Sequence, residues 1–305
     1  MVRYRLQPTR HAGAGVAYYG APMRNDHILA LSCPDRTGIV YRVSGLLFES
    51  GCNILDAQQF GDAESGTFFL RIHFDVPGKT TLEAFRSAFT RIADVFGMDW
   101  NVHDARRRAR LLVLVSKQGH CLNDLLFRTH SRQLRADIVA VASNHADFGA
   151  LAGSYGVPFH HLPVDAGNRE AQEQALLDLV EREHVDLVVL ARYMQILSPR
   201  LCAALAGRAI NIHHSFLPSF KGAQPYHQAH ARGVKLIGAT AHYVTPDLDE
   251  GPIIEQDVVR VDHAMTPSDL MRMGSDIESQ VLARAVRHHI QHRILPNGHR
   301  TVVFR

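Results

Sequence analysis

An amide and an imidazole stand two residues apart at the end of a predicted buried strand. Residues 209–214 have the sequence AINIHH, in which Asn211 and His213 occupy alternate positions. Alternate side chains of a strand project from the same face, and open α/β sheets bind ligands at the carboxyl ends of their strands. An asparagine amide can donate to a developing oxyanion and a histidine can relay a proton, which makes the pair a candidate for acyl chemistry. A polar strand end without catalytic function is the more common origin of an isolated Asn-x-His pattern.

An acidic loop in front of an apolar strand is the second candidate group. Residues 245–254 have the sequence TPDLDEGPII, with Gly251 and Pro252 as turn residues. A carboxylate in this loop, Asp249, could orient an attacking water and fix the protonation of His213. A solvated acidic turn is the favoured interpretation of the loop if it stands alone. The assignment therefore requires a fold that brings both segments together.

The elements that would do so form a C-terminal unit over residues 111–305. Short runs of valine, leucine and isoleucine, such as LLVLVS at 111–116 and DIVAVAS at 137–143, alternate there with helical segments. Nearly continuous apolar runs are typical of parallel strands that are buried on both faces. The fold class is therefore α/β, and this unit is predicted to be a doubly wound, mainly parallel domain of the Rossmann type. A helix over about 268–290 and a short tail complete it.

A smaller unit precedes it, over residues 25–103. Its apolar pattern predicts the order βαββαβ, the ferredoxin-like plan. The clearest strand alternates Phe68, Leu70, Ile72 and Phe74 with Phe69, Arg71, His73 and Asp75. Residues 1–24 are predicted to be a leader, and the basic stretch 104–110 (DARRRAR) a linker between the two units.

Composition limits the classes of protein to which the chain can belong. It has 305 residues, of which 46% are hydrophobic and 21% charged, as in a globular protein of two domains. The 33 basic and 30 acidic residues are too balanced for a nucleic-acid or membrane surface. Four widely spaced cysteines favour a reducing compartment over a disulfide framework or a zinc site, and with no signal-peptide pattern they indicate the cytoplasm.

Two segments together resemble the signature of the folate-dependent formyltransferases. They are N-I-H-H-S-F-L-P-S-F-K-G at 211–222 and D-L-D-E-G-P-I-I at 247–254. The resemblance implies that Asn211, His213 and Asp249 are the catalytic residues. It also places the folate pocket on the segment LARYMQIL at 190–197 and on the loop at Gly222. The implied folate-binding residues are Met194, Gln195, Ile196, Leu197 and Gly222.

Two departures from the family pattern favour water as the acceptor. The glycine-rich phosphate loop of glycinamide ribonucleotide transformylases is replaced by SKQGHC at 116–121, which keeps one glycine. Only a helix and a short tail are predicted after the matched segments, so we expect no C-terminal barrel of the kind that methionyl-tRNA formyltransferases use for tRNA. Tyr226 stands where the transformylases carry a histidine, and we expect it to close the acceptor side together with Gln224.

The N-terminal unit resembles an ACT domain, a regulatory amino-acid-binding module. The resemblance rests on the βαββαβ order and on the turn P-D-R-T-G-I-V at 34–40. It implies an effector site at Asp35, Gly38 and Ile39, for which a small amino acid such as glycine is the expected ligand. A surface that only joins two copies of the chain is the alternative, and a homo-oligomer is expected in either case.

An ACT unit in front of a formyltransferase-like unit is the architecture of the formyltetrahydrofolate deformylase branch of that family. The resemblance implies hydrolysis of 10-formyltetrahydrofolate to formate and tetrahydrofolate, which would supply formate for purine biosynthesis and balance the one-carbon pool, without a cofactor or metal. A formyltransferase with an amine acceptor is the nearest alternative. A metal-dependent hydrolase, suggested by the 20 histidines, and a non-catalytic sensor are the others. Adjacent histidines such as His160 and His161 diverge on a strand and make poor chelates.

Overall fold

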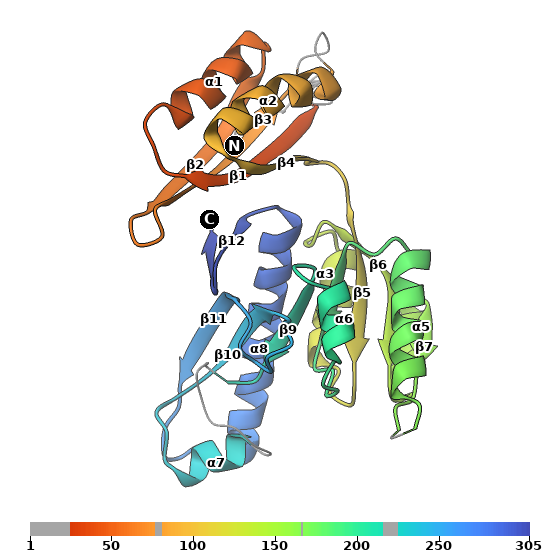
Figure 1. Cartoon of the computed structure of the whole chain (residues 1–305). Helices are drawn as coiled ribbons and strands as arrows, with labels where there is room; N and C mark the ends of the chain where they lie inside the picture. The colour runs from red at the N-terminus through yellow and green to blue at the C-terminus, as the bar shows by residue number, and fades with distance from the viewer. Residues whose placement is uncertain (1–24, 77–80, 166, 216–224) are drawn as a thin grey trace, which may run out of the picture.

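The computed structural model describes residues 25–76, 81–165, 167–215 and 225–305, which form two α/β domains (Figure 1). The predicted Gly222 and Gln224 lie outside these residues. The N-terminal domain is a four-stranded antiparallel sheet of order β2-β3-β1-β4 with two helices on one face. Its elements are β1 (Asp26–Pro34), α1 (Ile39–Glu49), β2 (Asn53–Asp62), β3 (Thr67–Asp75), α2 (Leu82–Phe96) and β4 (Asp99–Asp104). The ferredoxin-like prediction is confirmed.

Both helices of this domain bury one apolar stripe against the sheet. α1 buries Ile39, Val43 and Leu47 at intervals of four residues, as a helix with a single packed face requires. The hydroxyl of Thr81 caps α2 by accepting from the backbone N–H of Ala84 at 3.1 Å. These contacts fix the helices on one side and leave the other side of the sheet for the second domain.

The second domain is a seven-stranded sheet of order β11-β10-β9-β8-β5-β6-β7. Neighbours from β9 to β7 are parallel, whereas β10 and β11 add as antiparallel strands. The predicted mainly parallel, doubly wound class is confirmed. The strands are β5 (Ala109–Val115), β6 (Ala136–Ser143), β7 (Phe159–His161), β8 (Leu187–Leu190), β9 (Ala209–His213), β10 (Leu236–Tyr243) and β11 (Ile253–Arg260).

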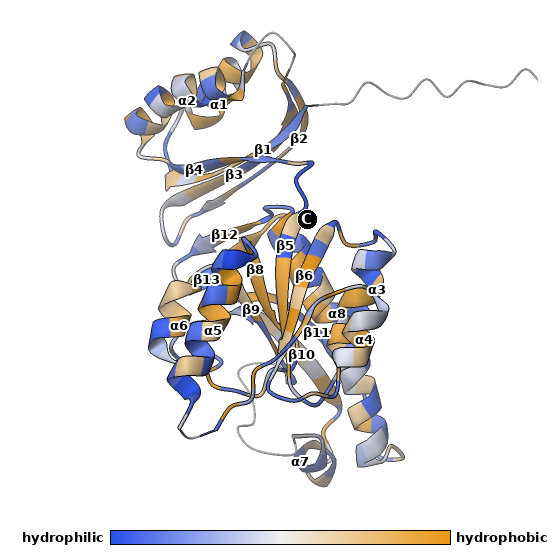
Figure 2. Ribbon diagram, turned by 90° about the vertical axis from the view of Figure 1, so that its right-hand side faces the viewer, coloured by the Kyte–Doolittle hydropathy of each residue, from blue (hydrophilic) through white to orange (hydrophobic). Residues whose placement is uncertain are grey.

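Helices cover both faces of this sheet, whose strands are strongly hydrophobic (Figure 2). One face packs against α3, α4 and α8, and the other against α5 and α6. The helices are α3 (His120–His130), α4 (Gly149–Ser154), α5 (Arg169–Arg182), α6 (Pro199–Ala204), α7 (Pro225–Ala231) and α8 (Pro267–Ile290). No helix among the described residues combines the length and the apolarity that a membrane span requires.

A hairpin replaces the short tail that the sequence predicted after the last helix. It consists of β12 (Ile294–Asn297) and β13 (Arg300–Val303), paired antiparallel. The hairpin explains why both faces of β3 are buried: Phe69, which is fully buried, packs with Leu295 and Phe304 instead of facing solvent. The alternation of apolar and polar residues in β3 therefore did not predict which of its faces is exposed to solvent.

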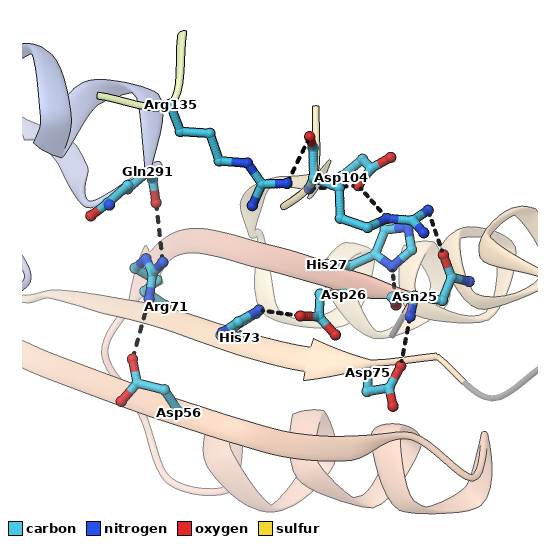
Figure 3. A network of polar contacts seen from close by, with 11 residues as sticks. Asn25, Asp26, His27, Asp56, Arg71, His73, Asp75, Asp104, Arg135 and Gln291 are labelled. Carbon is cyan, nitrogen blue, oxygen red and sulfur yellow. Dashed lines mark hydrogen bonds and ion pairs between the residues drawn. The ribbon is translucent and has the colours of Figure 1, made fainter. Parts of the chain in front are cut away.

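Arg71 ties the N-terminal sheet to the end of α8. Its buried guanidinium donates to the carbonyl oxygens of Gln291 at 3.1 Å and His292 at 3.2 Å, and it pairs with Asp56 at 3.2 Å (Figure 3). The last carbonyls of a helix lack intrahelical partners and carry partial negative charge, so a cation is favourable there. Burial lowers the Arg71 pKa to about 10, which leaves it charged at neutral pH.

Short polar links also connect the domains through the basic stretch. β4 ends at Asp104 and β5 begins at Ala109. Arg107 pairs with Asp186 at 2.8 Å, and Arg108 pairs with Asp137 at 2.7 Å. The basic side chains of this connection thus contact acidic groups of the second domain.

Two stacked imidazoles at the domain interface make the fold sensitive to acid. The rings of His103 and His292 lie parallel, with centroids 3.5 Å apart. Burial lowers the pKa of His103 to about 4 and that of His292 to about 3. The unfolded chain binds these protons near pH 6.5. The folded state is therefore favoured fully above pH 6.5, and this stabilisation is lost as the pH falls from about 6.5 towards about 3.

We expect His292→Asn to reduce this acid sensitivity. Asparagine tolerates the left-handed backbone at this position, where φ is 50°. Between pH 7.5 and 5.5 the variant should lose about 1 kcal/mol less free energy of unfolding than the parent. His184→Asn, at an exposed position with φ of 47°, is the matched control. Denaturant unfolding at both pH values measures the difference, and equal losses in parent and His292→Asn would contradict the analysis.

Candidate active site

The register of three neighbouring strands brings the predicted amide and imidazole together. Asn211 lies opposite Leu190 of β8 on one side and opposite His242 of β10 on the other. His213, two residues along β9, projects from the same face as Asn211. Both side chains line a cavity at the carboxyl end of the parallel strands, where the sequence placed them.

The loop between β10 and β11 carries the carboxylate to this pair. Asp249 Oδ2 lies 3.3 Å from His213 Nδ1. Asp249 has a left-handed backbone with φ of 58°, an uncommon conformation that aspartate tolerates better than most residues. Strained backbone persists where the surroundings enforce it, and it concentrates at functional sites. The structure thus unites Asn211, His213 and Asp249.

His242 is a fourth member of the group, and sequence reasoning missed it. Its side chain is buried, and its Nδ1 donates to the carbonyl oxygen of Tyr243 at 2.9 Å. With Nδ1 protonated, the neutral ring has Nε2 as an acceptor, and Asn211 Nδ2 lies 3.3 Å from it. Asp249 Oδ1 is 3.7 Å from the same nitrogen, too far for a hydrogen bond. Only the pairing of β10 with β9 reveals that His242 faces Asn211.

The charge state of the site follows from these contacts. The hydrogen bond from His213 holds the pKa of Asp249 well below its usual range despite partial burial. The carboxylate is therefore ionised at neutral pH. Burial, and then the nearby charge of Arg192, lower the pKa of His214 to about 4, so this ring stays neutral. No sequence pattern predicted a part for His214.

The cavity beside this group has a volume of about 220 Å³. Met194, Gln195, Ile196 and Leu197 line one wall, and Leu248 of the Asp249 loop lines another. The side chains of Met194 and Ile196 are 60% and 61% exposed. Large apolar side chains left open to solvent beside a cavity are typical of a surface that receives a flat ligand. Gly222, predicted to contribute to this pocket, lies outside the described residues.

A buried polar cluster joins the segment after β5 to α7 and α8. At its centre the Glu278 carboxylate, 1% exposed, accepts from His120 Nε2 at 2.7 Å and from the Tyr226 hydroxyl at 2.7 Å. Arg192 Nε lies 3.4 Å from the same carboxylate and donates to Gln118 Oε1 at 2.8 Å. Burial alone would raise the pKa of Glu278, but the hydrogen bond from His120 and the charge of Arg192 outweigh it and lower the pKa. Gln118 and His120, which follow β5, are thus both hydrogen-bonded to side chains from other parts of the domain.

The same cluster contains the one group of potential metal ligands found among the described residues. His120, Cys121 and Glu278 place donor atoms within 4.8 Å of one another. Both Glu278 oxygens already accept hydrogen bonds from protein groups. Burial strongly raises the pKa of the Cys121 thiol, which keeps it protonated, whereas a metal requires the thiolate. This donor set suits a hydrogen-bonded core better than a cation.

The predicted effector residues lie in the other domain, at the turn between β1 and α1. Gly38 begins α1 with φ of 94°, a conformation that glycine adopts at little cost. The Asp35 side chain is exposed, whereas Ile39 is 2% exposed and belongs to the domain core. Ile39 therefore offers almost no surface to a ligand from solvent.

Comparison with known proteins identifies the family. A model described as Formyl transferase matches residues 109–286, and one described as ACT domain matches residues 27–90. A formyltetrahydrofolate deformylase from Corynebacterium sp. (strain P-1) is 49% identical over 280 residues, 92% of this chain and 98% of that protein. The chain belongs to the formyltetrahydrofolate deformylase family. A relative of the same name from Bacillus subtilis (strain 168) is 47% identical over 278 residues, 90% of this chain and 93% of that protein.

Solved structures give the same result. The crystal structure of formyltetrahydrofolate deformylase from Burkholderia mallei has a TM-score of 0.88 and 52% identity, and covers 92% of this chain and 100% of that chain. Glycinamide ribonucleotide transformylase 1 from Symbiobacterium toebii has a TM-score of 0.62 and 34% identity, and covers 65% of this chain and 95% of that chain. The deformylase family therefore matches both domains, and the predicted resemblance is confirmed.

We expect Gly251→Ala to disturb the loop that carries Asp249. A Cβ atom at this position would lie 1.7 Å from the carbonyl oxygen of Tyr243 and 3.2 Å from His242 Nδ1, so the backbone must move. Overpacking of this kind costs about 1–3 kcal/mol. The variant should unfold at a lower temperature than the parent and bind a folate ligand more weakly.

Gly153→Ala is the matched control, because a Cβ at Gly153 meets nothing within 4 Å and the residue lies within α4. Alanine in a helix is favoured over glycine, so this variant should be as stable as the parent or more so. Thermal unfolding followed by circular dichroism checks both. Equal unfolding temperatures for Gly251→Ala and Gly153→Ala would contradict the close approach of Gly251 to the Tyr243 carbonyl oxygen.

Proposed function

We propose that the protein hydrolyses 10-formyltetrahydrofolate to formate and tetrahydrofolate. The observation that carries the proposal is the convergence of the Asn211 amide, the His213 imidazole and the Asp249 carboxylate at one end of a cavity. The relatives with which it shares about half of its residues are named for this activity. The apolar wall at Met194 and Ile196 supports binding of a flat ring system beside these groups.

In this proposal the formyl carbonyl lies among the three side chains. Water adds to the formyl carbon while its proton passes to the Asp249–His213 pair, and the carbonyl oxygen becomes an oxyanion. One N–H of Asn211 is held by His242, and the other donates to that oxyanion, a contribution of about 3 kcal/mol. The C–N bond then breaks as His213 returns the proton to the folate nitrogen. One water is consumed, and tetrahydrofolate, formate and one proton leave.

Water is favoured over an amine because the acceptor side of the site is filled. A Cβ on Gly119, the glycine kept in the loop after β5, would lie 2.3 Å from the Phe148 ring, so a side chain of the protein already covers this backbone. Tyr226 and His120 both bond to Glu278 and are engaged within the protein. A formyltransferase with an amine acceptor remains the second candidate, because family members with such acceptors share the catalytic domain.

We expect Asp249→Asn and Asn211→Ala each to lower formate release by a factor of about 10² to 10³. Asparagine keeps the left-handed conformation of residue 249 accessible, so the first variant tests the charge and not the fold. Glu250→Gln, an exposed neighbour outside the cavity, is the control and should retain parental activity.

The assay incubates purified protein with 10-formyltetrahydrofolate and no amine, and measures formate. We propose that no metal or cofactor takes part, so the rate should be the same after treatment with a chelator. Full activity in Asp249→Asn would refute the assignment. Tetrahydrofolate and a formylated amine that appear only after glycinamide ribonucleotide or another amine is added, with no formate, would favour the formyltransferase.

We further propose that the ACT domain regulates the enzyme and pairs two or more copies of it. Tyr41 and Phe48 on α1 are 77% and 83% exposed, an apolar surface that a second copy could cover. All four cysteines are free thiols, which supports the cytoplasm as its location. There it would supply formate for purine biosynthesis and balance the one-carbon pool.

Glycine is the proposed effector, held at Asp35, Gly38 and Ile39. Millimolar glycine should change the initial rate of the parent by at least twofold, and Asp35→Asn should remove the response because it removes the charge that would pair with the glycine ammonium. Glu49→Gln, at the opposite end of α1, is the control. A rate unaffected by glycine would leave the ACT domain as an assembly surface.

A further inference from the structure

A second cavity, of about 440 Å³, lies where the two domains meet. The N-terminal sheet contributes Ala30 and His103 to its walls, α6 contributes Ala203, and the end of α8 with the turn that follows contributes His289 and His292. Figure 1 shows the end of α8 and β12 beneath this sheet. Cavities of a few hundred Å³ between domains are where proteins commonly bind small molecules.

The walls of this interdomain cavity carry no charged side chain. Among the described residues that line it there is no aspartate, glutamate, lysine or arginine, and most of the surface is apolar. Pro246, Pro252 and Pro296 add rigid, flat faces. An ion placed here would lose its hydration without gaining a counter-charge, which costs several kcal/mol. The lining therefore favours a neutral ligand over a carboxylate, a phosphate or an ammonium group, because none of its side chains supplies a counter-charge.

Hydrogen-bonding capacity in the cavity comes from neutral imidazoles. Burial lowers the pKa values of His103 and His289 to about 4 and that of His292 to about 3. His289 Nδ1 is bonded to the Tyr243 hydroxyl at 2.8 Å. Among the described residues, His103 and His292 stack on each other, but no protein group hydrogen-bonds to either ring. Each neutral ring can thus offer one donor and one acceptor to a ligand.

The interdomain cavity and the candidate active site share a wall. Val244, Thr245 and Pro246, which follow β10, line both cavities and lead directly into the loop that carries Asp249. The residue before them, Tyr243, bonds through its hydroxyl to His289 and through its carbonyl oxygen to His242. An occupant that presses on this segment therefore acts on the groups around Asp249.

We infer that the interdomain cavity binds a neutral nitrogen heteroaromatic molecule of one or two rings, and that its binding lowers the activity of the neighbouring site. Flat proline and imidazole faces suit an aromatic ring, and unpartnered imidazole nitrogens suit its ring nitrogens. Asp249 contacts His213 in the arrangement of the loop that the structure shows. A displacement of residues 244–246 would separate that pair, which is why the expected effect is inhibition.

Binding is tested with indole and purine as neutral probes and indole-3-carboxylate as a charged one, by isothermal titration calorimetry on the full chain. At least one neutral probe should bind, and the charged probe at least tenfold more weakly. Ala203→Phe fills the cavity and should weaken binding at least tenfold. Ala204→Phe, an exposed neighbour on the same helix that does not line the cavity, should bind within twofold of the parent.

Thermal unfolding verifies that both phenylalanine variants are folded, and His103→Leu provides a second loss of binding if Ala203→Phe is not. No binding of either neutral probe to the parent at millimolar concentration would overturn the site. Equal binding to the parent and to a folded Ala203→Phe or His103→Leu protein would overturn its location.

The coupling rests on the proposed function and is measured separately. A saturating neutral probe should lower formate release by the parent at least threefold and have no effect on Ala203→Phe. Tyr243→Phe, which breaks the bond to His289, should still bind the probe but respond less to it. Binding without a change in rate would overturn the coupling. A chain without deformylase activity would refute the proposed function, while the calorimetric result would stand.

Discussion

The contact between His213 and Asp249 is the interaction on which the arrangement of the site depends. It joins a strand end to a loop 36 positions later in the chain, and it exists because β10 pairs with β9 before the chain turns back into β11. The left-handed backbone of Asp249 and the close approach of Gly251 to Tyr243 hold the carboxylate in place. The surrounding core contributes rigidity, because a packed interior resists small displacements.

Much of this could be predicted from local sequence patterns. The strands and helices could be located because an element that buries one face has apolar residues at a regular spacing along the sequence. Asn211, His213 and Asp249 were identified because short motifs keep them near strand ends. His242, Arg192 and Glu278 were missed because their partners lie far away in the chain: Glu278 meets His120 across the domain, a pairing that no local pattern records. The terminal hairpin was missed because its strands are only four residues long.

The two domains are joined more closely than a basic linker would suggest. Arg71 reaches from the N-terminal sheet to the last carbonyls of α8, and the histidines at the same junction are stacked and neutral. At neutral pH only the Arg71 guanidinium is charged at this junction, and the neutral imidazoles do not repel it. The residues that follow β10 line both the interdomain cavity and the cavity of the candidate active site.

The hairpin of β12 and β13 also has a consequence for biosynthesis. Phe69 is made early, yet the residues that cover it, Leu295 and Phe304, are more than two hundred positions later. At ribosomal rates of about 5 to 20 residues per second, the interval is on the order of 10 to 45 s. A nascent N-terminal domain can assemble its sheet and helices in that time, but one face of the sheet stays open. Until the hairpin is made, chaperones that bind apolar surfaces, or other unfinished chains, can bind to that face.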